Sequence, residues 1–128
     1  SKELMDRANK RGCYTISNRY GVEDIIGIIR KLEFIIAMRL HSLIYAAVQN
    51  IPMIGIIYDP KIEGFLNSIN MDKMSTVEDL EYKKLVEFID YTWENRNELI
   101  NRLKELNKPM KEEALKNIHI ALKLLNSR

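Results

Sequence analysis

Two side chains that can bind or protonate an anion stand close together in the sequence, at Arg39 and His41. The guanidinium of Arg39 is a fixed cation whose planar fork fits a carboxylate or a phosphate. The ring of His41 can donate to an anion or move a proton near neutral pH. An apolar run at residues 34–38 precedes the pair and an apolar helical pattern follows it, so both lie where a predicted strand meets a helix. This position predicts an anion site, since the free N–H groups of a helix start favour anions.

Each of these side chains also has a purely structural interpretation. Arg39 could form a salt bridge with a carboxylate of a neighbouring loop, because an unpaired guanidinium is costly to bury. His41 could pack, or bond a backbone carbonyl, in the first turn of its helix. No Ser, Thr, Asp or Asn stands at residues 38–40 to cap that helix. Its first N–H groups therefore need another partner, which is either a bound anion or water.

Further polar residues follow the neighbouring strand predicted at residues 53–57 and should lie along the same edge of the sheet. Tyr58 is expected to contact a ligand there, and Lys61 either does so or stays solvated. Asp59 is expected to cap the next helix. Gly55 interrupts the strand and leaves room for a ligand or for a tightly packed helix. A second set of rim residues ends the strand predicted upstream, namely Ser17, Asn18 and Arg19.

The first half of the chain alternates strand and helix patterns, which predicts parallel pairing, right-handed crossovers and an α/β fold. The continuous apolar run at 34–38 is typical of a strand covered on both faces. Because a helix opens the chain and three strands make a thin sheet, we expect the chain to begin inside a larger α/β domain. The predicted strands are 13–17, 34–38 and 53–57, and the predicted helices are 3–9, 22–31, 40–49 and one that begins at Asp59-Pro60.

The second half changes character after a polar linker predicted at residues 70–76. Two long amphipathic helices are predicted, 79–106 and 110–126, separated by a stop at 107–109. Residues 75–78 resemble a capping box for the first of them. The side chains expected to face inward are Tyr82, Val86, Ile89, Trp93, Ile100 and Leu103, then Ala114, Ile118, Ala121, Leu122 and Leu125.

Composition excludes several classes of protein. The 128 residues are 46% hydrophobic and 30% charged, as in one globular domain. A formal net charge of +2 does not supply a concentrated basic face, so we expect no nucleic-acid partner. No apolar stretch is long enough to span a bilayer. The single cysteine, Cys13, excludes an internal disulfide and a cysteine-based zinc cluster, and the sequence shows no other metal-ligand spacing. This cysteine usage favours a cytoplasmic, reducing location.

The ordered residues around the Arg39 and His41 pair resemble the polysaccharide pyruvyltransferase family, in particular members that act on bacterial secondary cell-wall polysaccharide. The likeness covers roughly residues 3–70. The residues that carry it are Met38-Arg39-Leu40-His41, Ala46-Ala47, Pro52, Gly55 and Tyr58-Asp59-Pro60-Lys61, with Asn18-Arg19-Tyr20 upstream.

The resemblance implies a fold similar to GT-B glycosyltransferases, in which two Rossmann-like domains face a cleft and the C-terminal domain holds the donor. Residues 1–70 would then be a partial donor-binding region, and residues 71–128 a helical extension of the same domain. The N-terminal domain would be missing, so we expect the fragment alone to be inactive. The implied enzyme transfers a pyruvyl group from phosphoenolpyruvate to two hydroxyls of a polysaccharide sugar, forming a ketal without cofactor or metal. A lipid-linked acceptor would place it at the inner face of the membrane.

By the same resemblance, Arg39 and His41 match the donor-binding pair and are the expected catalytic residues, with a contact from the Leu40 N–H. The position of Tyr58 and Lys61 after the neighbouring strand adds them as expected rim contacts. Arg39 would clamp an anionic group of the donor. His41 would either bind the phosphate or carry a proton, and both roles stay open. Two other functions remain: a nucleotide-sugar glycosyltransferase, for which no acidic ribose ligand is evident, and a non-catalytic module whose long helices bind a partner.

Overall fold

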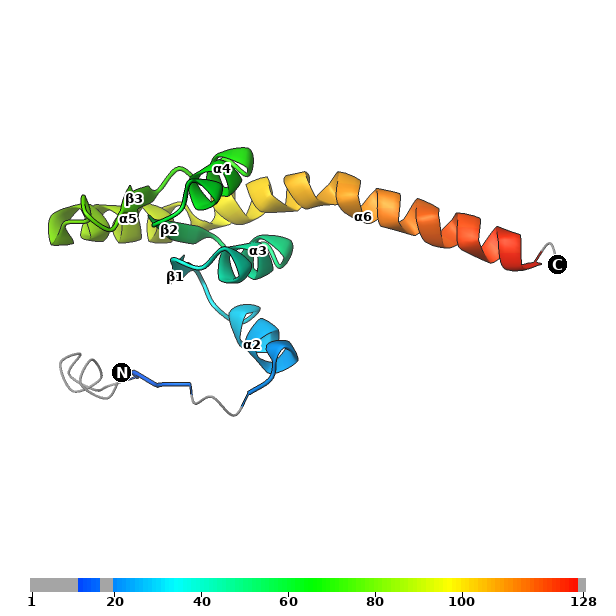
Figure 1. The fold of residues 1–128 in the computed structure, drawn as a ribbon, viewed down its shortest axis with the longest axis horizontal. Helices are drawn as coiled ribbons and strands as arrows, with labels where there is room; N and C mark the ends of the chain where they lie inside the picture. Colours follow the sequence, from blue (N-terminus) through cyan, green and yellow to red (C-terminus); the bar gives the residue numbers. More distant parts are fainter. Residues whose placement is uncertain (1–11, 17–19, 127–128) are drawn as a thin grey trace.

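The computed structural model describes residues 12–16 and 20–126, and Figure 1 shows their arrangement. The described strands form a parallel sheet in the order β1-β2-β3, which confirms the predicted α/β class. The helix predicted at residues 3–9 lies outside the described residues. The elements in chain order are α2 (Val22–Ile29), β1 (Ile35–Ala37), α3 (Leu40–Val48), β2 (Met53–Ile57), α4 (Pro60–Ser68), β3 (Met74–Thr76), α5 (Tyr82–Glu94) and α6 (Arg96–Asn126).

The hydrophobic core forms around the central strand β2, on which α3 and α4 both pack. Leu43 of α3, Met53 of β2 and Leu66 of α4 are almost completely buried, as is Leu103 of α6. Burial of a side chain of this size stabilises the fold by about 1.5–3 kcal/mol. This packing holds β1 and β2 in register, with Ile36 opposite Ile54, so that their carboxyl ends lie side by side.

The strand predicted at residues 13–17 is wrong over the part that the structure describes. Residues 13–16 have no regular structure there, and Tyr14 is 89% exposed. A short strand is stable only when a neighbouring strand pairs with it, and no described strand lies beside this segment (Figure 1). The strand predicted at 34–38 is present as the shorter β1, but Ile36 is 38% exposed because β1 lies at an edge of the sheet. The expectation that it is covered on both faces is therefore wrong.

The linker predicted at residues 70–76 contains β3, which the sequence pattern missed. The Gly55 N–H donates to the carbonyl of Lys73 at 3.0 Å, and this bond aligns β3 with β2.

The predicted capping box at 75–78 is also wrong. The Thr76 Oγ1 instead donates to the Asp79 carboxylate at 2.9 Å and accepts from the Asp79 N–H at 3.2 Å, which closes a turn before α5 begins.

Two C-terminal helices are present as predicted, but they are divided at Asn95 and not at 107–109 (Figure 1). The side-chain amide of Asn95 donates to the carbonyl of Tyr91 at 2.9 Å, and its backbone angles (φ −104°, ψ 16°) leave the helical range. Pro109 lies inside α6, where it removes one backbone N–H and does not end the helix.

The break at Asn95 shifts the phase of the apolar pattern, so the predicted inward face of residues 79–106 is only partly correct. Tyr82 and Trp93 are exposed, whereas Thr92, Leu99 and Leu103 are buried. The inward face predicted for residues 110–126 is wrong for the side chains that are described, because no part of the described chain covers that half of α6. Ile118, Ala121, Leu122 and Leu125 are all exposed. No helix in the described ranges is both long and apolar enough to cross a bilayer.

Candidate functional site

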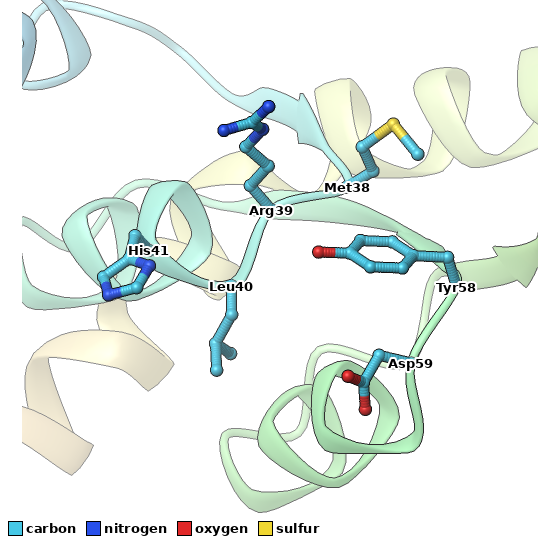
Figure 2. A pocket seen from close by; sticks show the side chains of 6 residues that line it. All are labelled: Met38, Arg39, Leu40, His41, Tyr58 and Asp59. Atoms are coloured by element: carbon cyan, nitrogen blue, oxygen red, sulfur yellow. The ribbon is translucent and has the colours of Figure 1, made fainter.

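A cavity of about 560 Å³ opens at the carboxyl ends of β1 and β2 (Figure 2). Four of its lining residues come from the junction between β1 and α3, and two come from the junction between β2 and α4. Because both strands are parallel, their carboxyl ends meet at the same edge of the sheet, which is where open α/β sheets bind ligands. The lining residues are Met38, Arg39, Leu40, His41, Tyr58 and Asp59.

The start of α3 supplies hydrogen-bond donors to this cavity. Arg39 is the N-cap residue, and its extended backbone (φ −97°, ψ 131°) lets its carbonyl accept from the Leu43 N–H at 3.2 Å. No side chain caps the helix, as the sequence predicted. Among the described residues, the N–H groups of Leu40, His41 and Ser42 have no hydrogen-bond partner. Three aligned donors at a helix start attract an anion.

Arg39 and His41 leave the junction in different directions, so their side chains do not converge on one point (Figure 2). Arg39 is exposed, and its guanidinium has no ion pair or hydrogen bond within the described part of the chain. The salt bridge considered from the sequence is therefore not found there. His41 is also exposed, and its ring centroid lies 6.4 Å from that of Tyr45. The Arg39 guanidinium and the His41 ring therefore lie on separate sides of the β1–α3 junction (Figure 2).

The opposite wall of the cavity is formed by the β2–α4 junction. Tyr58 is 61% exposed, and its ring lies across the opening with the hydroxyl directed toward the β1–α3 junction (Figure 2). The Asp59 carboxylate accepts from the Lys61 N–H at 2.9 Å, which confirms that Asp59 caps α4. Lys61 is exposed and is not among the lining residues. The rim residues predicted at 17–19 lie outside the described residues.

Met38 is a lining residue that the sequence did not single out as a binding residue. It directly follows β1 and is half-exposed, and its thioether adds an apolar group to the lining of the cavity (Figure 2). Its place immediately after a strand, next to Arg39, was the available signal. The cavity surface offers a cation and N–H donors together with an apolar face, which suits a small organic anion.

Gly55 does not open onto this cavity. A Cβ atom built on Gly55 would overlap Cδ1 of Leu66 and lie 3.5 Å from Leu66 Cγ. Of the two interpretations left open by the sequence, the structure therefore supports close packing of α4 against β2.

In the described ranges, no group of three His, Cys, Asp or Glu side chains is placed to hold a metal ion.

The cap at Asp59 gives a direct test of how the second wall is held. Replacing Asp59 with alanine is expected to destabilise the fold by about 1 kcal/mol, because the Lys61 N–H loses its acceptor. The free energy of unfolding in urea would measure the loss. The control is Asp59→Asn, which keeps an acceptor of similar shape and removes the negative charge, and it should stay close to the parent. Equal losses in both variants would show that the charge, and not the cap, stabilises this junction.

In a comparison with known protein families, the segment that contains the cavity matches one family model. Residues 2–60 match the family model described as polysaccharide pyruvyl transferase. All six lining residues fall within the matched segment. Neither the curated proteins nor the solved structures gave a match to the chain.

Proposed function

Because residues 2–60 match the family model described as polysaccharide pyruvyl transferase, we propose that the cavity at the β1–α3 junction binds phosphoenolpyruvate, the donor of a pyruvyl group. The observation that carries this proposal is a set of unsatisfied donors in an open cavity: the Arg39 guanidinium and the first N–H groups of α3. Phosphoenolpyruvate has a carboxylate and a phosphate, so it can engage both kinds of donor at once. The one carboxylate in the wall, that of Asp59, already accepts from the Lys61 N–H.

In the proposed binding mode, Arg39 holds one anionic group of the donor in its planar fork, and the N–H groups of Leu40 and His41 hold the other. The different directions of Arg39 and His41 suit a ligand with two anionic groups. Tyr58 presents the face of its ring to the apolar part of the donor or to the acceptor sugar. Lys61 adds a cation at the rim.

The proposed reaction begins with protonation of the methylene carbon of phosphoenolpyruvate, which makes C2 electrophilic. One sugar hydroxyl attacks C2 and loses its proton, which replaces the proton added to the methylene carbon. A second hydroxyl then displaces the phosphate, which leaves with that hydroxyl's proton, and a ketal and inorganic phosphate result. His41 either delivers the first proton to the methylene carbon or donates a hydrogen bond to the departing phosphate. In both roles its ring N–H acts on a group whose charge changes during the reaction. The sugar belongs to a cell-wall or surface polysaccharide and is either free or lipid-linked at the cytoplasmic face of the membrane.

Donor binding, and not turnover, is the appropriate test, because we propose that residues 1–70 bind the donor while the acceptor site requires a second, N-terminal domain of the GT-B type. Titration of the 128-residue chain with phosphoenolpyruvate is expected to shift the amide NMR signals of Leu40, His41 and Ser42, with a dissociation constant of about 1 mM or lower. An equimolar mixture of pyruvate and phosphate is the control and should bind more weakly.

A UDP-sugar provides the discriminating comparison. If it shifts the same amide signals and phosphoenolpyruvate does not, the site belongs to a nucleotide-sugar glycosyltransferase. If neither ligand shifts them, the anion site is not functional in this chain and the proposal fails.

A further inference from the structure

The C-terminal half of α6 carries a row of exposed apolar side chains. In Figure 1 this half extends well beyond the α/β body. Asn107 ties the middle of α6 to the body, because its side-chain amide donates to the Ala47 carbonyl at 2.8 Å and to Asn50 Oδ1 at 2.7 Å. The members of the row, which we call the leucine row, are 50–68% exposed; they are Leu115, Ile118, Leu122 and Leu125.

The spacing of the leucine row is that of a coiled-coil seam. Its members are separated by three, four and three residues, which are the a and d positions of two heptads. The positions beside the row are occupied by His119, Ala121 and Asn126, none of which carries a fixed charge. Lys116 and Lys123 lie on the opposite side of the helix. A second helix of the same sequence can therefore approach the row without bringing like charges together.

We propose that a second copy of this chain packs on the leucine row in the antiparallel direction. With the two helices centred on residue 120, Leu115 lies beside Leu125 of the second copy, and Ile118 lies beside its Leu122. The row is thus complementary to itself in this register, as a two-fold symmetric contact requires. The half of α6 that takes part, residues 110–126, is about 25 Å long.

The overall shape favours the antiparallel direction over the parallel one. The α/β body contacts the first half of α6, where Leu99 and Leu103 are buried. In an antiparallel pair, the two bodies lie at opposite ends of the paired helices and cannot collide. A parallel pair would place both bodies side by side at the same end.

The size of the surface predicts a weak dimer. The row exposes roughly 400 Å² of apolar surface per chain, so the pair would bury about 800 Å² or slightly more. This area is below the roughly 1,200–2,000 Å² of a stable specific interface and fits a weak, transient contact. The second copy also supplies tertiary support that the described part of the chain does not give this half of the helix, and isolated helices of this length are only marginally stable. A lipid surface fits less well, because Glu112 and Glu113 precede the row and nearly balance the lysines.

Sedimentation equilibrium of the 128-residue chain from about 10 μM to 1 mM tests the proposal, and a reversible monomer–dimer equilibrium is the expected result. The double variant Ile118→Lys/Leu122→Lys should raise the dissociation constant by about a hundredfold or more. Its matched control is Ile120→Lys/Leu124→Lys, which changes two apolar residues away from the row on the same helix. The control should stay within about twofold of the parent. Circular dichroism would verify that both variants keep their folded body.

Disulfide cross-linking in a Cys13→Ser background tests the register. His119→Cys should cross-link readily, because residue 119 lies near its own counterpart only in the antiparallel pair. Leu115→Cys should not, since residue 115 meets its counterpart only in a parallel pair. The proposal is overturned by a chain that stays monomeric at 1 mM, by equal losses in both double variants, or by cross-linking of Leu115→Cys alone. A monomer that floats with vesicles of phosphatidylglycerol would assign the row to a lipid surface instead.

Discussion

Replacing Arg39 with alanine is expected to weaken phosphoenolpyruvate binding by the 128-residue chain about 10- to 100-fold, which corresponds to the 1.5–3 kcal/mol of a hydrogen bond to a charged group. The physical reason is that Arg39 is the cavity's one guanidinium and has no competing partner in the described ranges. Nothing has to be broken before it meets the ligand. Isothermal titration calorimetry of the parent and the variant, at the same ionic strength, measures the change.

Two matched variants make the Arg39 result specific. Arg39→Lys keeps the positive charge and loses the planar fork, so it should bind between the parent and the alanine variant. Lys104→Ala removes a cation from the exposed side of α6, far along the chain from the cavity, and should bind like the parent. Parent-like binding by Arg39→Ala, together with loss of binding in His41→Ala, would contradict the assignment and place the anion on the His41 side of the junction.

The directions of these two side chains are what the sequence could least predict. The spacing of Arg39 and His41 predicted that both would stand where β1 meets α3, and the structure places them there. Their closeness in the sequence does not reveal where the side chains point, and in the structure they point apart (Figure 2). The side chain of an N-cap residue and that of a first-turn residue diverge because the backbone changes from extended to helical between them. Sequence spacing fixes the positions of the Cα atoms in such a turn, and the rotamers follow from the surroundings.

Helices and strands with a strong local pattern were predictable from the sequence, whereas those that depend on distant contacts were not. The helix at residues 40–49 and the strand at 53–57 match α3 and β2 closely, because their apolar periods are strong and a turn at Asn50 separates them. β3 was missed because it has three residues and only one of them is buried. The break at Asn95 depends on one bond between a side chain and the backbone, and such a bond leaves no periodic trace. Long-range pairing and single capping bonds therefore decide the elements that pattern alone cannot.

Gly55→Ala is the second change for which we expect a large effect, a loss of about 1–3 kcal/mol in the free energy of unfolding. The added methyl group would occupy the space of the Leu66 side chain, whose Cδ1 overlaps the Cβ position and whose Cδ2 lies 3.7 Å from it. Leu66 is completely buried in the core, so it cannot swing aside without displacing α4 from the sheet. Urea unfolding followed by circular dichroism gives the free energy directly.

Gly64 in α4 is the matched control, because a Cβ atom there meets no atom within 4 Å. Gly64→Ala should therefore leave the stability unchanged or raise it by up to about 1 kcal/mol, as expected for a glycine replaced inside a helix. A double variant isolates the contact: Leu66→Ala removes the obstructing atoms, so Gly55→Ala should cost much less in that background than in the parent. Additive losses would contradict the close-packing explanation. A Gly55→Ala variant with the parent's stability and impaired phosphoenolpyruvate binding would instead return Gly55 to the ligand site.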